Sequence, residues 1–200
     1  MATRLPDYLL KRSFAMFYDI KIGAMTRRLP LCPISDTMSI GAFVMFGDTE
    51  LTEYCADELL KRAPADFDVM ITAESKGIPL ICSMARKSGK GRYILARKSV
   101  KLYMSHVMKC EVQSITTTGK QTLYLDGADA DYMKGKRVLI VDDVISTGAS
   151  LEALEALVAQ AGGEVVGRMA VLAEGEAISR TDITVLAPLP LFKADGTPLS

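Results

Sequence analysis

The sequence has few of the residues that mark a secreted or zinc-binding protein. Its 200 residues include no tryptophan, one histidine and four cysteines. The cysteines are widely spaced and form no CxxC pair: Cys32, Cys55, Cys82 and Cys110. One histidine and no clustered cysteines exclude an ordinary zinc site. We therefore expect four buried, reduced thiols in a protein of a reducing compartment.

Long apolar runs and an excess of one charge are also missing. No apolar run approaches the ~18 residues of a membrane span, and charges interrupt the segment 5–21, so we expect no signal peptide. Lysine plus arginine equals aspartate plus glutamate at 24 each, which leaves no net field to attract nucleic acid or an acidic membrane. We expect a cytoplasmic protein, with no nucleic-acid or membrane partner, that binds anions at a local cluster.

What the chain does have is an alternation of strand-like and helix-like segments. Strands are predicted at 69–73, 92–97, 121–127, 137–142, 164–174 and 181–189, and helices begin near Thr49, Ile78 and Leu151. Nearer the start, roughly helical spacing relates Leu9, Leu10, Phe14 and Phe17. Strands alternating with helices favour right-handed crossovers and a mostly parallel sheet flanked by helices. With 49% apolar residues, the chain can form the core of one α/β domain.

A long polar segment, Lys98 to Lys120, separates two of these strands. A loop of this length in a compact domain is usually functional or disordered. The strand-like QTLYLDG that follows suggests that the loop ends in a β-ribbon. Such a segment has the length and the polar character of a lid that excludes water from a site.

The stretch VLIVDDVISTGAS, Val138 to Ser150, is the strongest signal in the chain. An apolar strand leads into a turn of small residues before the next helix: Ser146, Thr147, Gly148, Ala149 and Ser150. Backbone N–H groups and hydroxyls of such a turn converge on one anion at a helix N-terminus. Gly148 permits a close backbone approach or a positive φ. A phosphate fits this turn.

Two carboxylates, Asp142 and Asp143, precede that turn. They repel a phosphate, but as acceptor-only groups they suit vicinal hydroxyls beside it. A phosphate next to a diol describes a ribose 5-phosphate. The other phosphate loops, GxGxxG and GxxxxGK[ST], are absent from the chain. The plainer alternative is an ordinary strand and turn in which the acids cap the next helix.

VLIVDDVISTGAS resembles the phosphoribosyl pyrophosphate (PRPP) motif of type I phosphoribosyltransferases, and the resemblance extends from about Val69 to Glu174. TAESKGIPL resembles the family's pyrophosphate turn, and ARKSVK the start of its catalytic loop. The resemblance is to the purine enzymes that use adenine, hypoxanthine and guanine, or xanthine. It implies a core at about 49–187, a hood from 1–48 and the C-terminal segment, purine salvage from PRPP and a purine base, and a homodimer. It also implies a magnesium ion held mainly by PRPP and water, with no certain protein ligand.

The resemblance also implies a role for each matching residue. Asp142 and Asp143 would hold the ribose hydroxyls, and the turn 146–150 the 5-phosphate. Catalysis is assigned to Asp142, Asp143 and Lys101, and pyrophosphate binding to Glu74, Ser75, Lys76, Gly77, Arg97 and Lys98. Without the resemblance, Lys76 would simply begin a helix, and the basic residues 97–101 would form a solvated face.

The acceptor base stays open at the level of sequence. Adenine enzymes carry a serine-leucine-glutamate-tyrosine-glycine stretch in the loop, whereas this chain has Ser114 to Gly119 with threonines at Thr116–Thr118. Because this chain lacks the glutamate of that stretch, the comparison favours the hypoxanthine and xanthine enzymes more than it otherwise would. His106 is either an exposed loop residue or a proton-transfer group. The alternatives are a non-catalytic regulator that senses PRPP or a nucleotide, and an enzyme that accepts orotate.

Overall fold

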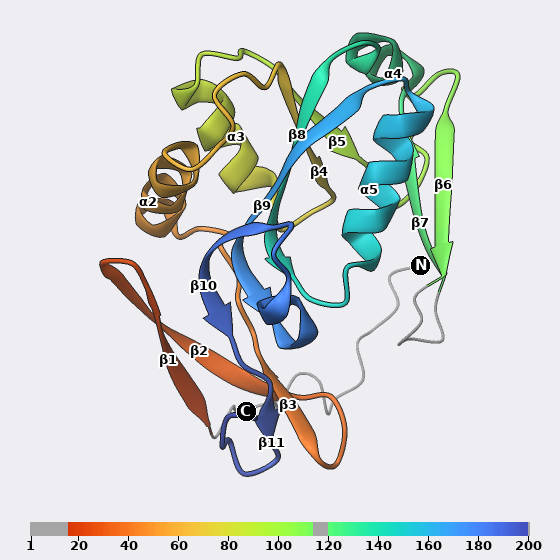
Figure 1. Ribbon diagram of the computed structural model, residues 1–200. Helices are drawn as coiled ribbons and strands as arrows, with labels where there is room; N and C mark the ends of the chain where they lie inside the picture. Colours follow the sequence, from red (N-terminus) through yellow and green to blue (C-terminus); the bar gives the residue numbers. More distant parts are fainter. Residues whose placement is uncertain (1–15, 114–119, 200) are drawn as a thin grey trace. The chain divides into compact units, whose positions relative to one another are not determined.

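The computed structural model describes residues 16–113 and 120–199 (Figure 1). The chain divides into two compact units, one of Met1–Phe43 with Pro190–Ser200 and one of Val44–Leu189. None of the described helices is long and apolar enough to cross a membrane. The smaller unit joins both ends of the chain, and the larger unit contains every residue that the sequence assigns to PRPP.

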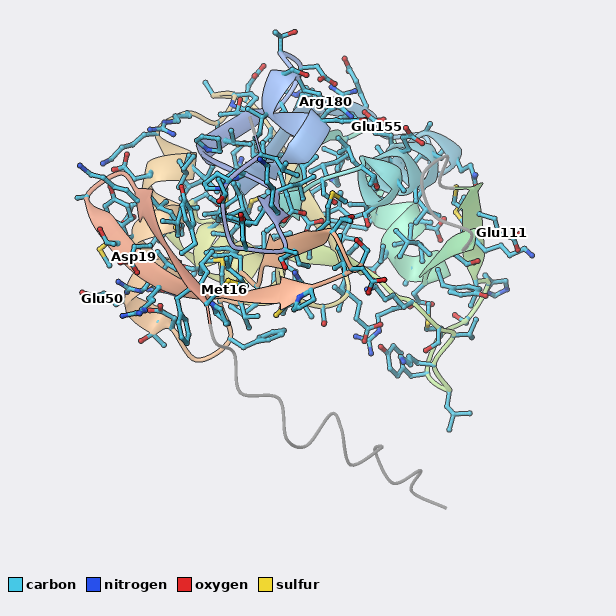
Figure 2. The ribbon with its side chains drawn as sticks, turned by 90° about the horizontal axis from the view of Figure 1, so that it is seen from below. Met16, Asp19, Glu50, Glu111, Glu155 and Arg180 are labelled. Carbon is cyan, nitrogen blue, oxygen red and sulfur yellow. The ribbon has the colours of Figure 1, made fainter. Side chains whose placement is uncertain are left out.

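The smaller unit is an antiparallel sheet in the order β1-β2-β3-β11. Its strands are β1 (Phe17–Ile22), β2 (Met25–Pro33), β3 (Met38–Gly41) and β11 (Phe192–Lys193). In β1, Ile20 and Ile22 are buried while Asp19 is exposed, the period of two expected of a half-buried strand (Figure 2). The predicted helical spacing is therefore wrong at Phe17, which begins β1. Leu9, Leu10 and Phe14 lie outside the described residues.

The larger unit is built on a five-stranded sheet in the order β10-β9-β8-β4-β5 with every neighbouring pair parallel. Its strands are β4 (Val69–Ala73), β5 (Tyr93–Ala96), β8 (Arg137–Ile145), β9 (Glu164–Glu174) and β10 (Thr184–Leu189). All five residues of β4 are buried, as expected of a parallel strand covered on both faces. The predicted α/β class with a mostly parallel sheet is confirmed.

Helices cover both faces of this sheet, with α2 and α3 on one side and α5 on the other (Figure 1). The helices are α2 (Thr49–Leu60), α3 (Ile78–Lys87), α4 (Gly127–Met133), α5 (Ala149–Gln160) and the short 3-10 helix η1 (Gly175–Ser179). The Asp48 side chain caps α2 by accepting a hydrogen bond from the Leu51 backbone N–H at 3.1 Å. The sequence did not predict α4, which has only seven residues.

A network of charges joins α2 to α3. Glu53 on α2 accepts hydrogen bonds from Ser83 and Arg86 on α3, at 2.8 and 2.7 Å, and pairs with Lys87 at 3.2 Å. The hydrogen bond from Ser83, then those from Arg86 and Lys87, lower the pKa of Glu53 to about 2. The Glu53 carboxylate therefore links two helices that cover the same face of the sheet.

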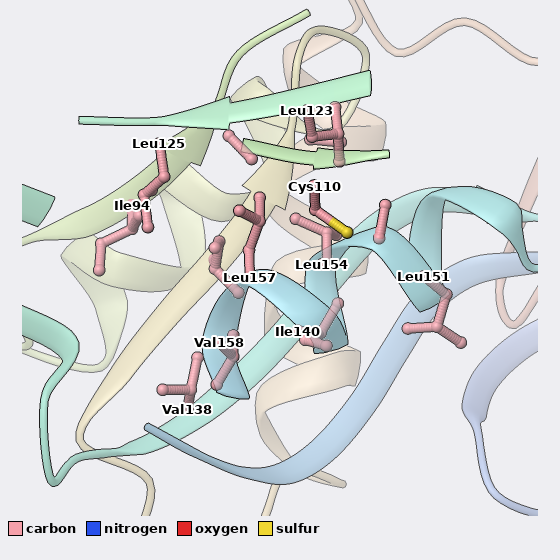
Figure 3. Close-up of a cluster of buried hydrophobic side chains, with 14 of the residues drawn as sticks. Ile94, Cys110, Leu123, Leu125, Val138, Ile140, Leu151, Leu154, Leu157 and Val158 are labelled. Carbon is pink, nitrogen blue, oxygen red and sulfur yellow. The ribbon is translucent and has the colours of Figure 1, made fainter. Parts of the chain in front are cut away.

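The polar segment 98–120 is only partly a loop. Residues Met108–Gln113 form β6, which pairs antiparallel with β7 (Lys120–Leu125). The predicted ribbon is confirmed, but it begins earlier than expected, because Cys110 on β6 and Leu123 on β7 are buried against α5 (Figure 3). The residues Thr116–Thr118 lie outside the described part of the chain.

The expectation that all four cysteines are buried thiols is only half right. All four are free, and Cys55 and Cys110 are buried. Cys32 is partly buried and Cys82 is exposed on α3. Cys82 differs because it lines a surface cavity of about 230 Å³ together with Pro79 and Arg86.

Candidate active site

Three of the segments assigned to PRPP lie at one edge of the parallel sheet. The turn Glu74–Gly77 follows β4, the turn Ser146–Gly148 follows the neighbouring strand β8, and the basic segment that begins at Arg97 follows β5 on the other side of β4. Ligands of such sheets bind beyond the carboxyl ends of the strands. One detail differs from the sequence expectation, since β8 continues past the predicted end at Asp142 to Ile145 and so contains Asp143 as well. Pairing with β9, through Asp142 to Ala170 and Ile145 to Ala173, extends the strand past the carboxylates.

An ion pair joins the turn Glu74–Gly77 to strand β8. The Lys76 Nζ lies 3.1 Å from the Asp143 Oδ2, and the Asp143 side chain is buried while half of Lys76 is exposed. Asp142 Oδ1 accepts a hydrogen bond from the Asp143 backbone N–H at 2.9 Å. The segment assigned to pyrophosphate and the residues assigned to the diol are thus in direct contact.

Gly77 makes this close approach possible. A Cβ atom at this position would lie 2.5 Å from the Thr72 Oγ1 and 3.1 Å from the Asp142 Oδ1. Thr72 is fully buried in β4, so its side chain has little room to move. Glycine at the N-cap of α3 therefore lets the turn pack against β4 and β8.

Asp142 is the most electrostatically perturbed group in the site. Burial, followed by the charge of Asp143, raises the pKa of Asp142 well above its usual value, and the Lys76 ammonium partly opposes this. Two adjacent carboxyls resist double ionisation when they are buried together. Asp142 therefore holds a proton to higher pH than an ordinary aspartate does.

Glu74 gathers the basic residues that follow β5. Its Oε2 accepts a hydrogen bond from the Lys98 backbone N–H at 3.0 Å and lies 3.6 Å from the Arg97 Nε. That hydrogen bond, and then the charges of Arg97, Lys101 and Lys98, lower the pKa of Glu74. Lys101 Nζ donates to the Ser99 Oγ at 2.6 Å. The Glu74 side chain therefore holds the basic segment beside the pyrophosphate turn.

The turn after β8 encloses a small cavity of about 40 Å³. It is lined by Asp142, Val144, Ile145, Ser146, Thr147, Gly148, Ala149, Ser150 and Leu151. Gly148 adopts φ +85°, a conformation that favours glycine, directly before the twelve-residue helix α5. All five residues predicted to hold a phosphate line this cavity at the helix N-terminus.

Two charged residues near these turns were not predicted. Glu174 ends β9, one residue after the Ala173 that pairs with Ile145. Burial raises the pKa of Glu174, while Lys76 lowers it and Asp143 raises it. Arg180 lies against Gly148. The place of Glu174 at a strand end was legible in the sequence, but no spacing pointed to Arg180.

His106 lies with a different part of the fold. It has a positive φ of 48°, and a Cβ on Gly127 would lie only 2.8 Å from the His106 Cβ. Ser105 is fixed at the same place, because its N–H donates to the Asp126 Oδ1 at 2.8 Å. His106 is exposed, and its role as a proton-transfer group stays a prediction.

Comparison with known proteins identifies the family. Residues 49–187 match the family model described as the phosphoribosyl transferase domain. The chain belongs to the phosphoribosyltransferase family. This is a family of transferases, and the resemblance stated from the motif is confirmed.

Relatives of this phosphoribosyltransferase carry two kinds of name. The adenine phosphoribosyltransferase of Cenarchaeum symbiosum is 38% identical over 60% of this chain and 68% of its own length. That of Thermotoga petrophila is 43% identical over 50% of this chain and 56% of its own. The hypoxanthine/guanine phosphoribosyltransferase of Methanosarcina acetivorans is 33% identical over 64% of each chain. Two of these three matches span less than two thirds of the relative.

Solved structures support the phosphoribosyltransferase fold. The adenine phosphoribosyltransferase of Thermoanaerobacter pseudethanolicus superposes with a TM-score of 0.67 and 22% identity, covering 80% of this chain and 95% of that one. The family match contains both turns and the basic segment but ends before Pro190 and begins after Phe43. The smaller unit therefore lies outside the part of the chain that the family match describes.

Proposed function

We propose that this phosphoribosyltransferase transfers the 5-phosphoribosyl group of PRPP to a purine base, releasing pyrophosphate, in purine salvage. The observation that carries the proposal is the contact between Lys76 and Asp143, which joins a pyrophosphate turn to a diol site. The relatives named for adenine and for hypoxanthine and guanine support a purine as the acceptor.

The proposed placement of PRPP follows the charges of the site. The 5-phosphate would lie in the cavity of the turn 146–150, against backbone N–H groups at the start of α5. Asp142 and Asp143 would accept hydrogen bonds from the ribose hydroxyls. Lys76, with the basic segment Arg97, Lys98 and Lys101, would face the pyrophosphate.

The reaction needs positioning and charge stabilisation. A ring nitrogen of the base forms a bond to C1 of the ribose as the bond from C1 to the pyrophosphate oxygen breaks, and the base loses one proton. Positive charge grows on the sugar ring, where the Asp143 carboxylate would stabilise it. Negative charge grows on the leaving group, where Lys76 and Lys101 would stabilise it. Holding both reactants in place supplies the rest of the rate enhancement.

Magnesium is the proposed cofactor. Among the described residues, no three His, Cys, Asp or Glu side chains are grouped to hold a metal ion. A hard cation that keeps several water ligands fits such a site when substrate phosphates supply the other oxygens. Its chemistry would be to neutralise charge on the pyrophosphate. Asp142 and Asp143 would hold the ribose hydroxyls beside it. A homodimer, expected from the family resemblance, and a cytoplasmic location, expected from the composition, complete the proposal.

The experiment is nucleotide formation from PRPP and magnesium with adenine, hypoxanthine, guanine, xanthine and orotate in turn. Turnover with one purine supports the proposal and names the base. The double variant Asp142→Asn, Asp143→Asn should lose that turnover while keeping its cooperative unfolding transition. Turnover with orotate alone contradicts the purine assignment, and PRPP binding without turnover on any base favours a regulator.

A further inference from the structure

The cavity assigned to the 5-phosphate has an unbalanced charge. Among the residues that line it, Asp142 is the one ionisable side chain, so the lining offers a phosphate no cation. Glu152, in the first turn of α5, adds a carboxylate near the same helix end. Backbone N–H groups and the hydroxyls of the turn would have to hold a phosphate dianion without any positive side chain. A nearby cation would remove that imbalance.

Arg180 is a cation that lies against this turn. A Cβ on Gly148 would lie 3.0 Å from the Arg180 Nη1, so the guanidinium is in contact with the turn's backbone. Arg180 directly follows η1 and is drawn beside α5, where Glu155 is labelled (Figure 2). It does not line the cavity itself, so any effect on a bound phosphate acts through Gly148 and through its charge.

The Arg180 side chain is held in one orientation. Its Nε donates to the Asp182 Oδ1 at 2.9 Å, and its Nη2 donates to the Asp182 Oδ2 at 2.6 Å. This two-point carboxylate contact fixes the plane of the guanidinium. The third nitrogen, Nη1, has no hydrogen-bond partner among the described residues, and it is the atom that faces Gly148.

We propose that Arg180 is a positioning residue for the 5-phosphate of PRPP: it fixes the backbone of the turn at Gly148 and supplies the positive charge that the cavity lacks. This inference rests on the proposed function. Asp182 serves the same end by orienting Arg180. The pyrophosphate end of the substrate, which lies with Lys76 and the basic segment, is independent of this contact.

Binding of two half-ligands to the intact protein tests the inference. Ribose 5-phosphate reports the 5-phosphate turn, and magnesium pyrophosphate reports the other end. We expect Arg180→Gln to weaken ribose 5-phosphate roughly tenfold and to raise the KM for PRPP similarly, with kcat and pyrophosphate affinity changed less than about twofold. Arg180→Lys, which keeps the charge but loses the two-point contact with Asp182, should recover only part of the loss.

The matched control is Arg92→Gln, which removes an arginine that pairs with Asp129 of α4 instead. It should leave both affinities near those of the wild type. Equal ribose 5-phosphate affinity in Arg180→Gln and wild type overturns the inference, as does an equal loss for both half-ligands. If the wild-type protein binds neither half-ligand nor PRPP, the proposed function fails, and this inference with it.

Discussion

Replacing Gly77 with alanine tests the close packing of the turn Glu74–Gly77 against strands β4 and β8. At φ −72° and ψ −10° the position tolerates an L-residue, so the backbone alone favours the change. In the unfolded state the alanine restricts the chain, which stabilises the fold by about 0.4–1 kcal/mol. The backbone conformation alone therefore predicts that Gly77→Ala makes the protein more stable.

The packing around Gly77 opposes this gain. The new Cβ would lie 2.5 Å from the Thr72 Oγ1, about 0.9 Å inside the 3.4 Å at which ordinary contacts begin. Thr72 is fully buried, and overpacking of this kind costs about 1–3 kcal/mol. The packing effect is the larger one, so we expect a net loss of about 1–2 kcal/mol in the free energy of unfolding.

The same methyl group would disturb the substrate site, because it would lie 3.1 Å from the Asp142 Oδ1. We expect Gly77→Ala to reduce PRPP turnover at least about tenfold, since small displacements of reacting groups are costly. Urea denaturation measures the change in the free energy of unfolding, and steady-state kinetics at saturating base measures the change in PRPP turnover.

A double-mutant cycle with Thr72→Ala separates packing from other causes. Thr72 makes only a long hydrogen bond of 3.5 Å to the Ala73 carbonyl, so removing its hydroxyl sacrifices little beyond the buried methyl. In the Thr72→Ala background, Gly77→Ala should be neutral or stabilising. If Gly77→Ala costs the same stability in both backgrounds, or leaves both stability and turnover unchanged, then packing against Thr72 does not explain why glycine is needed at position 77.

Three further predictions concern other parts of the larger unit. Because the pKa of Glu53 is lowered from 4.5 to about 2, its contribution to stability is present above pH 4.5 and is lost as the pH falls to 2. In Glu53→Gln, the free energy of unfolding measured in urea should therefore change less with pH across that window than in the wild type. The pKa of Glu174 is raised, so its ionisation favours the unfolded state, and the free energy of unfolding of the wild type should decline as the pH rises above 4.5. That decline should be smaller in Glu174→Gln. Asp126→Ala, but not Asp126→Asn, should speed hydrogen exchange at the Ser105 amide, and equal exchange in both variants would contradict the 2.8 Å hydrogen bond.

Much of the larger unit was predictable because local chemistry and tertiary packing agree there. The apolar run of β4 is buried on both faces, and Asp48 caps α2 directly before its amphipathic pattern begins. The turn 146–150 combines small residues with a strand before it and a helix after it, so its place in the fold follows from sequence order. These features depend on neighbours within a few residues.

The remaining features depend on partners distant in sequence. Phe17 belongs to β1 because β2 pairs with it, which a helical spacing of apolar residues does not reveal. Residues 108–113 form a strand because β7 and α5 cover them. Arg180 reaches Gly148 across more than thirty residues of chain, and no local pattern encodes that contact.

Three of the cations that the proposed site would use have a carboxylate partner in the protein itself. The pairs are Lys76 with Asp143, Arg97 with Glu74, and Arg180 with Asp182. Such partners hold a cation in place before the substrate arrives, which lowers the entropy lost on binding. They also compete with the substrate for the same charge. In the proposed site, Asp143 would pair with Lys76 again once pyrophosphate has formed, so the pair would also limit how tightly the product is held.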